Sequence, residues 1–550
     1  MSPRRLIVLL GLMLAVVAFA FGQTASSAFP PDELLQRITA EGLRAHMAFL
    51  ADDLLEGRGT GTRGYQLAAD YVRAQFEEMG LRPAGVNRTY FQNVPFRKIE
   101  LLQDKSSLTL KHGGTTRTLV FDKDYVMGGD PLSSDTKVAG RVVFVGFGVS
   151  APEFGYDDYA GIDVRGKIVA ALYGAPSKLP SAPGAHFSSS EQKLRMAAEH
   201  GAIGFLTIWA GKAEQRTPFS EYVRFSMGPA LRWLDDKGIP NDVQPKIKGY
   251  ARISSAAAEA LFEGALKSWK DTLRAAEDSQ PQAFPLATSV SMHVVSHYSE
   301  LESPNVAAIL PGSDPRLKNE YVVFTAHLDH LGIGDPVKRD SIYNGAADNA
   351  SGTAALLEMA RAFSEMKTAP RRSLLFIAVT GEEEGLLGSD YYAHYPTVPM
   401  AQIVADINMD EVSFLYDFKD IVPLGGEHSS LGAVADDVAK HMGLTVSPDP
   451  VPEEVYFIRS DQYSFILQGV PALYIGEGLQ AVNPNLDGKK MQFDWETQRY
   501  HQPSDDMNQP FDFNATVKCT RVDLAAGYEV AQQTDRPHWN AGDFFGKFAK

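Results

Sequence analysis

The 550-residue sequence contains a single cysteine, Cys519. One thiol can form no intrachain disulfide, and it cannot supply the several thiolates of a cysteine-based zinc site. Its place near the C-terminus also excludes its use as a lipoprotein anchor. Any metal must therefore be held by histidine, aspartate and glutamate.

Positive charge is scarce relative to negative charge. The chain has 52 lysines and arginines against 68 acidic residues, a formal net charge of −16. Such a surface repels phosphate backbones. We therefore expect no nucleic acid as a partner.

Long apolar runs are also scarce, and the most prominent one stands at the start. Arg4 and Arg5 precede an apolar run from Leu6 to Ala20 that ends in small residues. A spanning helix needs about 20 apolar residues, so residues 1–20 are predicted to be a secretory signal peptide, with a membrane anchor as the alternative. Loss of its two arginines changes the net charge from −16 to −18. We expect a periplasmic or extracellular protein with no stable membrane anchor after cleavage.

The length favours two or more compact units, and 44% hydrophobic residues indicate a globular protein. Residues 30–80 carry apolar positions at helical spacing. Between two such stretches lies "GTGTRG", residues 59–64, which matches the G-x-G-x-x-G pattern of dinucleotide sites. Because a helical pattern and no strand precedes it, we interpret it as a turn between helices.

The rest of the chain divides into regions with different predicted secondary structure. Residues 87–130 read as short strands, and residues 135–280 contain strands and helices of their own but no cluster of histidines with carboxylates. After about residue 285, strand-like and helix-like segments alternate. Alternation of this kind predicts an α/β sandwich with a largely parallel sheet, whose active site lies at the carboxyl ends of the strands.

Metal-ligating residue types collect at those strand ends. The segments are "TAHLDH", "NGAADNASG", "VTGEEE", "DINMDE" and "YHQPSDD", which contain His327, Asp329, Asp348, Glu382, Glu383, Asp410 and His501. These are ligands suited to Zn²⁺. Each residue alone has an ordinary explanation: Asp348 could cap the following helix, as could Asn349 or Ser351, and the glutamates could form a solvated turn. One metal site explains them together better than five separate coincidences.

These segments, spread over some two hundred residues, resemble the M28 family of zinc aminopeptidases. The resemblance implies a three-layer α/β sandwich with a mixed, largely parallel central sheet, formed by residues 30–134 and 285–545. Residues 135–284, with "YDDYAGIDVRGKIV" and "AAEHGAIGFLTI", resemble the protease-associated (PA) domain that many members carry as an insertion.

Carried over by position, the resemblance implies two Zn²⁺ ions. His327 and Asp410 would bind one ion, Glu383 and His501 the other, and Asp348 would bridge them. Asp329 would accept the second ring N–H of His327. Glu382 would be the general base for attack of a metal-bound water on a peptide bond, and Glu384 would face solvent.

Removal of residues from the amino terminus is implied by the family alone. Glu382 and Asp410 could receive a substrate α-ammonium, whereas a carboxypeptidase would need an arginine, for which Arg459 is a candidate. The alternatives are therefore a glutamate carboxypeptidase-like enzyme, a glutaminyl cyclase, or an inactive binding scaffold. The side-chain pocket is expected in loops between residues 413 and 480.

Overall fold

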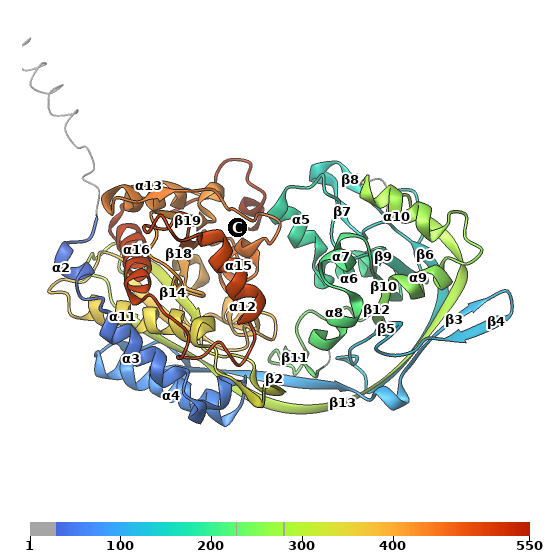
Figure 1. The fold of residues 1–550 in the computed structure, drawn as a ribbon, viewed down its shortest axis with the longest axis horizontal. Helices are drawn as coiled ribbons and strands as arrows, with labels where there is room; N and C mark the ends of the chain where they lie inside the picture. Colours follow the sequence, from blue (N-terminus) through green and yellow to red (C-terminus); the bar gives the residue numbers. More distant parts are fainter. Residues whose placement is uncertain (1–28, 227, 279–280, 550) are drawn as a thin grey trace, which may run out of the picture.

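The computed structural model describes residues 29–226, 228–278 and 281–549, so the predicted signal peptide lies outside the described residues. The chain forms two lobes, each built around its own sheet (Figure 1). One strand, β13 (Phe284–Leu310), belongs to both sheets. Its first half pairs in the smaller lobe, and its second half pairs in the larger one.

The sheet of the larger lobe is mixed. β17, β14, β18 and β21 run parallel to one another, and antiparallel strands flank them on both sides. The order is β11-β2-β13-β17-β14-β18-β21-β19-β20, with bounds β11 (Ala230–Trp233), β2 (Phe91–Leu101), β17 (Ser373–Val379), β14 (Tyr321–His327), β18 (Ile403–Asn408), β21 (Ala472–Glu477), β19 (Asp420–Leu424) and β20 (Thr445–Val446).

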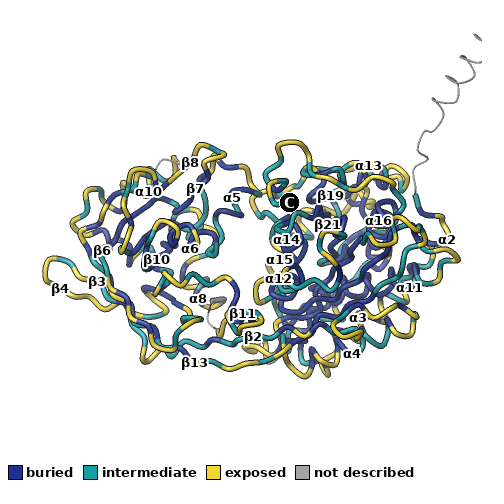
Figure 2. The backbone as a smooth tube through the Cα atoms, turned by 180° about the vertical axis from the view of Figure 1, so that it is seen from behind, coloured by how far each residue is buried: buried dark blue, intermediate teal, exposed yellow. Residues whose placement is uncertain are grey.

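Helices cover both faces of this sheet because its central strands are buried on both sides. On one face, Val322, Phe324 and Ala326 of β14 pack in a core with helices α3 (Ala40–Leu50), α4 (Arg63–Glu78), α11 (Gly352–Ser364), α13 (Leu431–His441) and α16 (Phe513–Gln532). On the other face, Val323 packs in a core with α12 (Leu387–His394) and α14 (Gln462–Ile466). Figure 2 shows this buried interior. The predicted three-layer α/β sandwich is confirmed.

The smaller lobe has a second mixed sheet in the order β4-β3-β13-β6-β9-β10-β12-β5. Its strands are β4 (Thr115–Thr118), β3 (Ser107–His112), β6 (Asp135–Phe144), β9 (Ile168–Leu172), β10 (Gly204–Trp209), β12 (Tyr250–Ser254) and β5 (Tyr125–Val126), and its helices are α5 (Ser181–Ser188), α6 (Ser190–Glu199), α7 (Lys212–Arg216), α8 (Phe219–Ser226), α9 (Ser255–Leu261) and α10 (Trp269–Glu277). Two apolar cores lie on its faces.

The lobe boundaries differ from the predicted insertion at 135–284. Strands β3, β4 and β5, which precede residue 135, pair in the smaller sheet, and so does β13 as far as Val295. Conversely, β11 lies inside the predicted insertion but pairs with β2 of the larger sheet. The cause is hydrogen-bond pairing between distant strands, which composition along the chain does not reveal.

The first four residues of the "GTGTRG" stretch form the predicted turn between the 3₁₀-helix η1 (Asp53–Arg58) and α4, and its last two residues begin α4. Thr62 caps α4 by accepting the backbone N–H of Tyr65. Within the described ranges, no helix has the length and apolar character needed to cross a membrane.

Candidate metal centre and substrate cavity

The predicted ligands stand at the ends of adjacent parallel strands. His327 is the last residue of β14, Glu382 and Glu383 follow β17, and Asp410 follows β18. Asp348 lies in the turn η5 (Ala346–Ser351) before α11, and His501 follows α15 (Gly488–Gln498). Because parallel strands end at one edge of a sheet, these side chains meet there.

Asp348 lies between two groups of ligands and offers one carboxylate oxygen to each. Its Oδ1 is 3.2 Å from Nε2 of His327, which is also 3.1 Å from Oδ1 of Asp410. Its Oδ2 is 3.2 Å from Nε2 of His501, which is 3.1 Å from Oε2 of Glu383. The structure thus brings together all five residues predicted as ligands, with Asp348 in the shared position.

Several atoms of this cluster are buried without a hydrogen-bond partner among the described residues. They include Oε1 of Glu383, Nε2 of His501 and both ring nitrogens of His330, which make no hydrogen bond of regular geometry although some of them face one another at 2.6–3.2 Å. Buried polar atoms normally find partners. The ligand atoms of His327, Asp348 and Asp410 lie within 4.8 Å of one another, as do those of His330, Asp348 and Glu383, which suits a divalent cation such as Zn²⁺. The donor set therefore fits the metal that the sequence predicts.

The electrostatics agree with mutual stabilisation of opposite charges. Burial alone would raise the pKa of Asp348, but His330, His327 and His501 hold it well below its usual value. Likewise, burial would lower the pKa of His327, but Asp410 and Glu382 raise it well above its usual value. A bound cation would replace the protons in the role of compensating this negative charge.

His330 is a member of the cluster that the sequence analysis missed. Its ring is 1% exposed, and Nδ1 lies 2.6 Å from Oε1 of Glu383 and 3.8 Å from Oδ2 of Asp348. It stands in the same "TAHLDH" segment as His327, three positions later. A second histidine in a segment already assigned to a metal site was the available signal.

Asp329 takes a position different from the predicted one. Nδ1 of His327 lies 3.1 Å from the backbone carbonyl oxygen of Asp329, not from its carboxylate. This carbonyl accepts the ring N–H and leaves Nε2 facing the cluster. The Asp329 carboxylate instead accepts the backbone N–H groups of Glu382 (3.1 Å) and Glu383 (3.3 Å) and the hydroxyl of Thr60. It therefore orients the glutamate turn.

Neighbouring polar groups also fix Asp348. Asp505, which is fully buried, accepts the backbone N–H groups of Ala347 and Asp348. The start of α11 is capped by Asn349, whose Oδ1 accepts the N–H of Gly352 at 2.8 Å. Capping by Asn349 leaves the carboxylate of Asp348 available to the histidines.

Arg58, from the segment before α4, holds the loops of the site together. Its guanidinium is 1% exposed and donates to the backbone carbonyls of Leu50, Leu328, Asn344 and Gly345. The carbonyls of Leu328, Asn344 and Gly345 flank the His327 and Asp348 segments, and that of Leu50 ends α3. The "GRGTGTRG" stretch thus supports the cluster through an arginine and does not form a nucleotide site.

The three adjacent glutamates differ in their surroundings. Burial, Glu383 and Asp410 raise the pKa of Glu382 well above its usual value, although His327 opposes the shift. Burial and Asp348 would raise the pKa of Glu383, but His501 and His330 lower it to about 2. Glu384 is exposed. Glu382 therefore holds a proton more readily than Glu383 does.

A cavity of about 200 Å³ opens beside the cluster. Its lining consists of Asp348, Glu382, Asp410, Glu411, Glu454, Tyr456, Arg459, Ser460, Tyr474, Glu496 and Tyr500. Burial raises the pKa of Tyr456, Tyr474 and Tyr500, and Glu411 adds to the shift. These tyrosines therefore keep their hydroxyl protons. The expected loops between 413 and 480 supply part of the wall, α15 and the segment after it supply Glu496 and Tyr500, and the strand ends of the metal cluster supply the rest.

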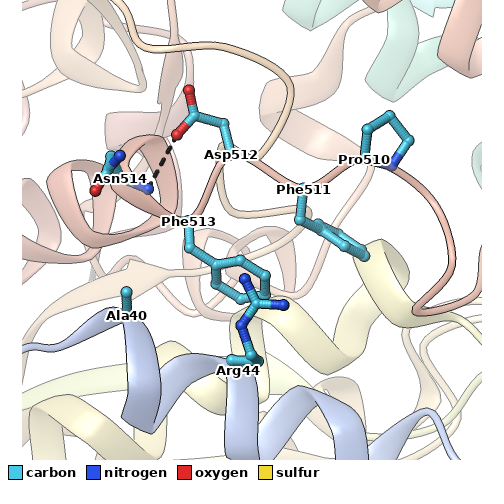
Figure 3. Close-up of a pocket in the computed structure, with 7 residues that line it drawn as sticks. All are labelled: Ala40, Arg44, Pro510, Phe511, Asp512, Phe513 and Asn514. Atoms are coloured by element: carbon cyan, nitrogen blue, oxygen red, sulfur yellow. Dashed lines mark hydrogen bonds between the residues drawn. The ribbon is translucent and has the colours of Figure 1, made fainter.

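A larger, more open hollow of about 500 Å³ lies at the start of α16 (Figure 3). Its polar groups are already engaged: Asp512 caps α16 by accepting the N–H of Asn514 at 3.0 Å, and Arg44 lies over the ring of Phe513. It contains none of the clustered histidines and acids. The smaller cavity is therefore the candidate active site.

Comparison with known proteins agrees with this location. The sequence matches the model of Peptidase family M28 over residues 305–526. That range contains the clustered histidines and every carboxylate between them. A solved aminopeptidase from Aneurinibacillus sp. strain AM-1 is similar in fold, with a TM-score of 0.51 and 19% identity over 92% of this chain and 96% of that chain.

Curated relatives match shorter parts. Transferrin receptor protein 2 of Rattus norvegicus is 26% identical over 293 residues, or 51% of this chain and 32% of that protein. Aminopeptidase NAALADL1 of Mus musculus is 30% identical over 165 residues, or 29% of this chain and 20% of that protein. The chain thus spans about a third or less of the length of these relatives.

Proposed function

Because the chain belongs to peptidase family M28, we propose that it is a secreted di-zinc aminopeptidase that removes residues from the amino termini of peptides. His327 and Asp410 would hold one Zn²⁺, Glu383 and His501 would hold the other, and Asp348 would be shared. His330 lies close enough to Glu383 to assist the second site. When bound, the ions would lower the pKa of water to about 7 and polarise the scissile carbonyl.

One observation carries the proposal. A single carboxylate, Asp348, faces two separate histidine–carboxylate pairs, while Glu382 lines the adjoining cavity. Two cations a few ångströms apart repel each other, so a shared anion between them is the arrangement that a two-metal site needs.

Glu382 is the proposed general base. Its side chain lines the cavity, and burial together with Glu383 and Asp410 raises its pKa, so that it accepts a proton more readily than an exposed glutamate does. Glu382 takes a proton from the attacking water and passes it to the departing amine, which leaves poorly without one. The Asp329 carboxylate fixes the backbone of Glu382 so that the side chain reaches into the cavity.

The charge of the cavity supports attack at the amino terminus. Six carboxylates line it against one cation, Arg459. Such a wall attracts an α-ammonium and repels the α-carboxylate that a carboxypeptidase must bind. Arg459 lies in the wall, as the carboxypeptidase alternative requires, but its Nη1 is 3.2 Å from Oε2 of Glu454 and its charge is partly compensated.

The test compares peptides with free and acetylated amino termini, with product analysis by mass spectrometry. We expect stepwise release of residues from free amino termini and no cleavage of acetylated peptides. Cleavage of acetylated peptides from the carboxyl end would favour the carboxypeptidase. Cyclisation of an amino-terminal glutamine without hydrolysis would favour the cyclase.

The alternative to an enzyme is an inactive binding scaffold, and one relative is named as a receptor. All five ligand positions and Glu382 are filled here. Metal analysis of the purified chain should give two Zn²⁺ ions per molecule. A chain that cannot be loaded with metal would favour the scaffold.

Secretion and the nature of the smaller lobe are parts of the same proposal. We infer that residues 1–20 are removed during export, which sequencing of the mature amino terminus tests. We also infer that the smaller lobe is a PA domain, because it has its own sheet and cores.

A further inference from the structure

The cavity beside the metal cluster has an unusual lining for an enzyme that accepts aliphatic residues. Acidic residues and three tyrosines make up most of the wall, and no aliphatic side chain lines it among the residues that the structure describes. Apolar pockets of ligand sites are predominantly lined by hydrophobic side chains. The volume, about 200 Å³, suits a single large side chain.

The cavity and the metal cluster together contain more carboxylates than two divalent cations would neutralise. Two divalent cations would be matched by four carboxylates, those of Asp348, Glu382, Glu383 and Asp410. The remaining acids of the wall are Glu411, Glu454 and Glu496.

Glu454 is already compensated by two arginines. Its Oε2 lies 3.2 Å from Arg459, and its Oε1 lies 3.2 Å from Nη1 of Arg216 on α7 of the smaller lobe. Glu411 and Glu496 have no such ion pair among the described residues. These two carboxyl groups outnumber the single α-ammonium of a substrate. Burial and the nearby Asp348 and Asp410 raise the pKa of Glu411, and a cationic side chain beside it would favour its ionised form.

The tyrosines provide a surface for a second cation. The hydroxyl of Tyr456 donates to Oε1 of Glu496 at 2.8 Å, which holds that carboxylate at the wall. Tyr474 and Tyr500 also line the cavity. The ring of Tyr456 lies under the guanidinium of Arg459 at 5.4 Å, and the ring of Tyr500 stacks on His501 at 3.8 Å. Aromatic faces attract ammonium and guanidinium groups, and they also pack against the methylene stems of lysine and arginine.

We propose that this cavity selects peptides whose first residue is lysine or arginine, with Glu411 and Glu496 receiving the positive charges and the tyrosines packing against the side chain. The inference rests on the proposed aminopeptidase function. It adds a substrate class to that function.

The test measures kcat/KM of the zinc-loaded full chain on aminoacyl 4-nitroanilides. Arginine is paired with citrulline, which has its shape without its charge, and lysine is paired with norleucine. We expect each basic substrate to exceed its neutral partner by about tenfold or more, as one charge-assisted hydrogen bond provides. The ratio should fall as salt is added, because Glu496 is exposed.

Glu496→Gln should reduce the ratio of arginine to citrulline, mainly through KM for arginine. Glu411→Gln should reduce the ratio as well, with metal content measured to show that the neighbouring Asp410 still binds. Glu384→Gln is the matched control, because Glu384 is exposed and outside the cavity wall, and it should leave the ratio unaltered.

Two failures would be distinguishable. Equal rates for arginine and citrulline, or leucine as the best substrate, would overturn the basic preference while leaving the aminopeptidase in place. No hydrolysis of any substrate with a free amino group, by a chain loaded with two metal ions, would overturn the proposed function itself.

Discussion

The backbone N–H of Glu382 donates to the carboxylate of Asp329, with 3.1 Å between nitrogen and oxygen. Asp329 is fully buried and also accepts the N–H of Glu383. A side chain from one strand end thus sets the backbone of the proposed base and of a proposed ligand on the next strand. The two catalytic elements are coupled through one carboxylate.

Asp329→Asn should therefore lower activity without removing a ligand. An amide has one acceptor oxygen, so its NH₂ group would face one of the two backbone N–H groups, which costs about 1–3 kcal/mol. We expect kcat to fall by tenfold or more. Thr60→Val, which removes only the hydroxyl on the same carboxylate, is the control and should have a smaller effect. Equal effects of the two changes would contradict this role.

The adjacent glutamates should separate into three phenotypes. Glu382→Gln should keep both metal ions and lose most activity, about 10²-fold or more, because a general base is lost. Glu383→Gln should lose one metal ion, and Glu384→Gln should change little because its side chain is exposed. Metal analysis with steady-state kinetics checks all three. An inactive, metal-loaded Glu384→Gln would show that the roles are assigned to the wrong residues.

Asp505→Asn should weaken metal binding from outside the ligand set. Asp505 accepts the N–H groups of Ala347 and Asp348 and so positions the shared carboxylate. Supporting groups of this kind contribute about 10–100-fold in metal affinity. Titration with a competing chelator measures the effect. Asp506→Asn, next in sequence and outside this contact, is the control, and equal affinities in the two variants would argue against the role of Asp505.

Removal of metal should lower stability as well as activity. Without cations, several buried carboxylates and three histidines remain crowded around Asp348. A ligand that binds only the folded state stabilises it by about 2.7 kcal/mol at 100 times its Kd. Chelation should therefore lower Tm by several degrees, and added Zn²⁺ should restore both Tm and hydrolysis. An unchanged Tm after verified metal loss would contradict the site.

Glu358 should make stability depend on acid pH. This side chain on α11 is 2% exposed and lies 2.8 Å from Arg361 and 3.8 Å from His46 of α3. Burial would raise its pKa, but His46 and Arg361 lower it from 4.5 to about 2. Its contribution is present above pH 4.5 and is lost as the pH falls towards 2. By linkage it amounts to about 3 kcal/mol.

Denaturant unfolding of Glu358→Gln and of the unmodified chain at several pH values checks this. The stability difference between them should shrink as the pH falls from 6 towards 3. Glu33→Gln, at an exposed position, should show no such trend. A constant difference for Glu358→Gln would contradict the interpretation.

The sequence allowed the metal cluster to be predicted because its residues follow a rule of topology. His327, Glu383 and Asp410 each end or follow a buried strand, and parallel strands end at one edge. His330 was missed because its place in the cluster depends on the path of the chain after β14, which pairs with Gly59 from a distant segment. Asp329 accepts the ring N–H of His327 through its backbone carbonyl, which leaves its carboxylate to the glutamate turn, and the sequence does not reveal this division.

The lobe boundary could not be located for a different reason. The 27-residue strand β13 alternates exposed and buried residues through its first half and is continuously buried near its end. Each pattern predicts a strand, but neither identifies the partner. Only the pairing with β6 and then with β2 shows where one sheet gives way to the other.

That shared strand limits how the chain can be dissected. Excision of residues 135–284 would leave β3 and β4 without most of their sheet and would take β11 from the edge of β2. A cut near Leu102 and Val295, where one backbone hydrogen bond joins the two segments at 2.8 Å, follows the actual seam. Even then β2 would gain an unpaired edge, a template for aggregation. Because both sheets share β13, the two lobes cannot be exchanged independently. Recombination that replaces the smaller lobe must also supply a strand for the catalytic sheet.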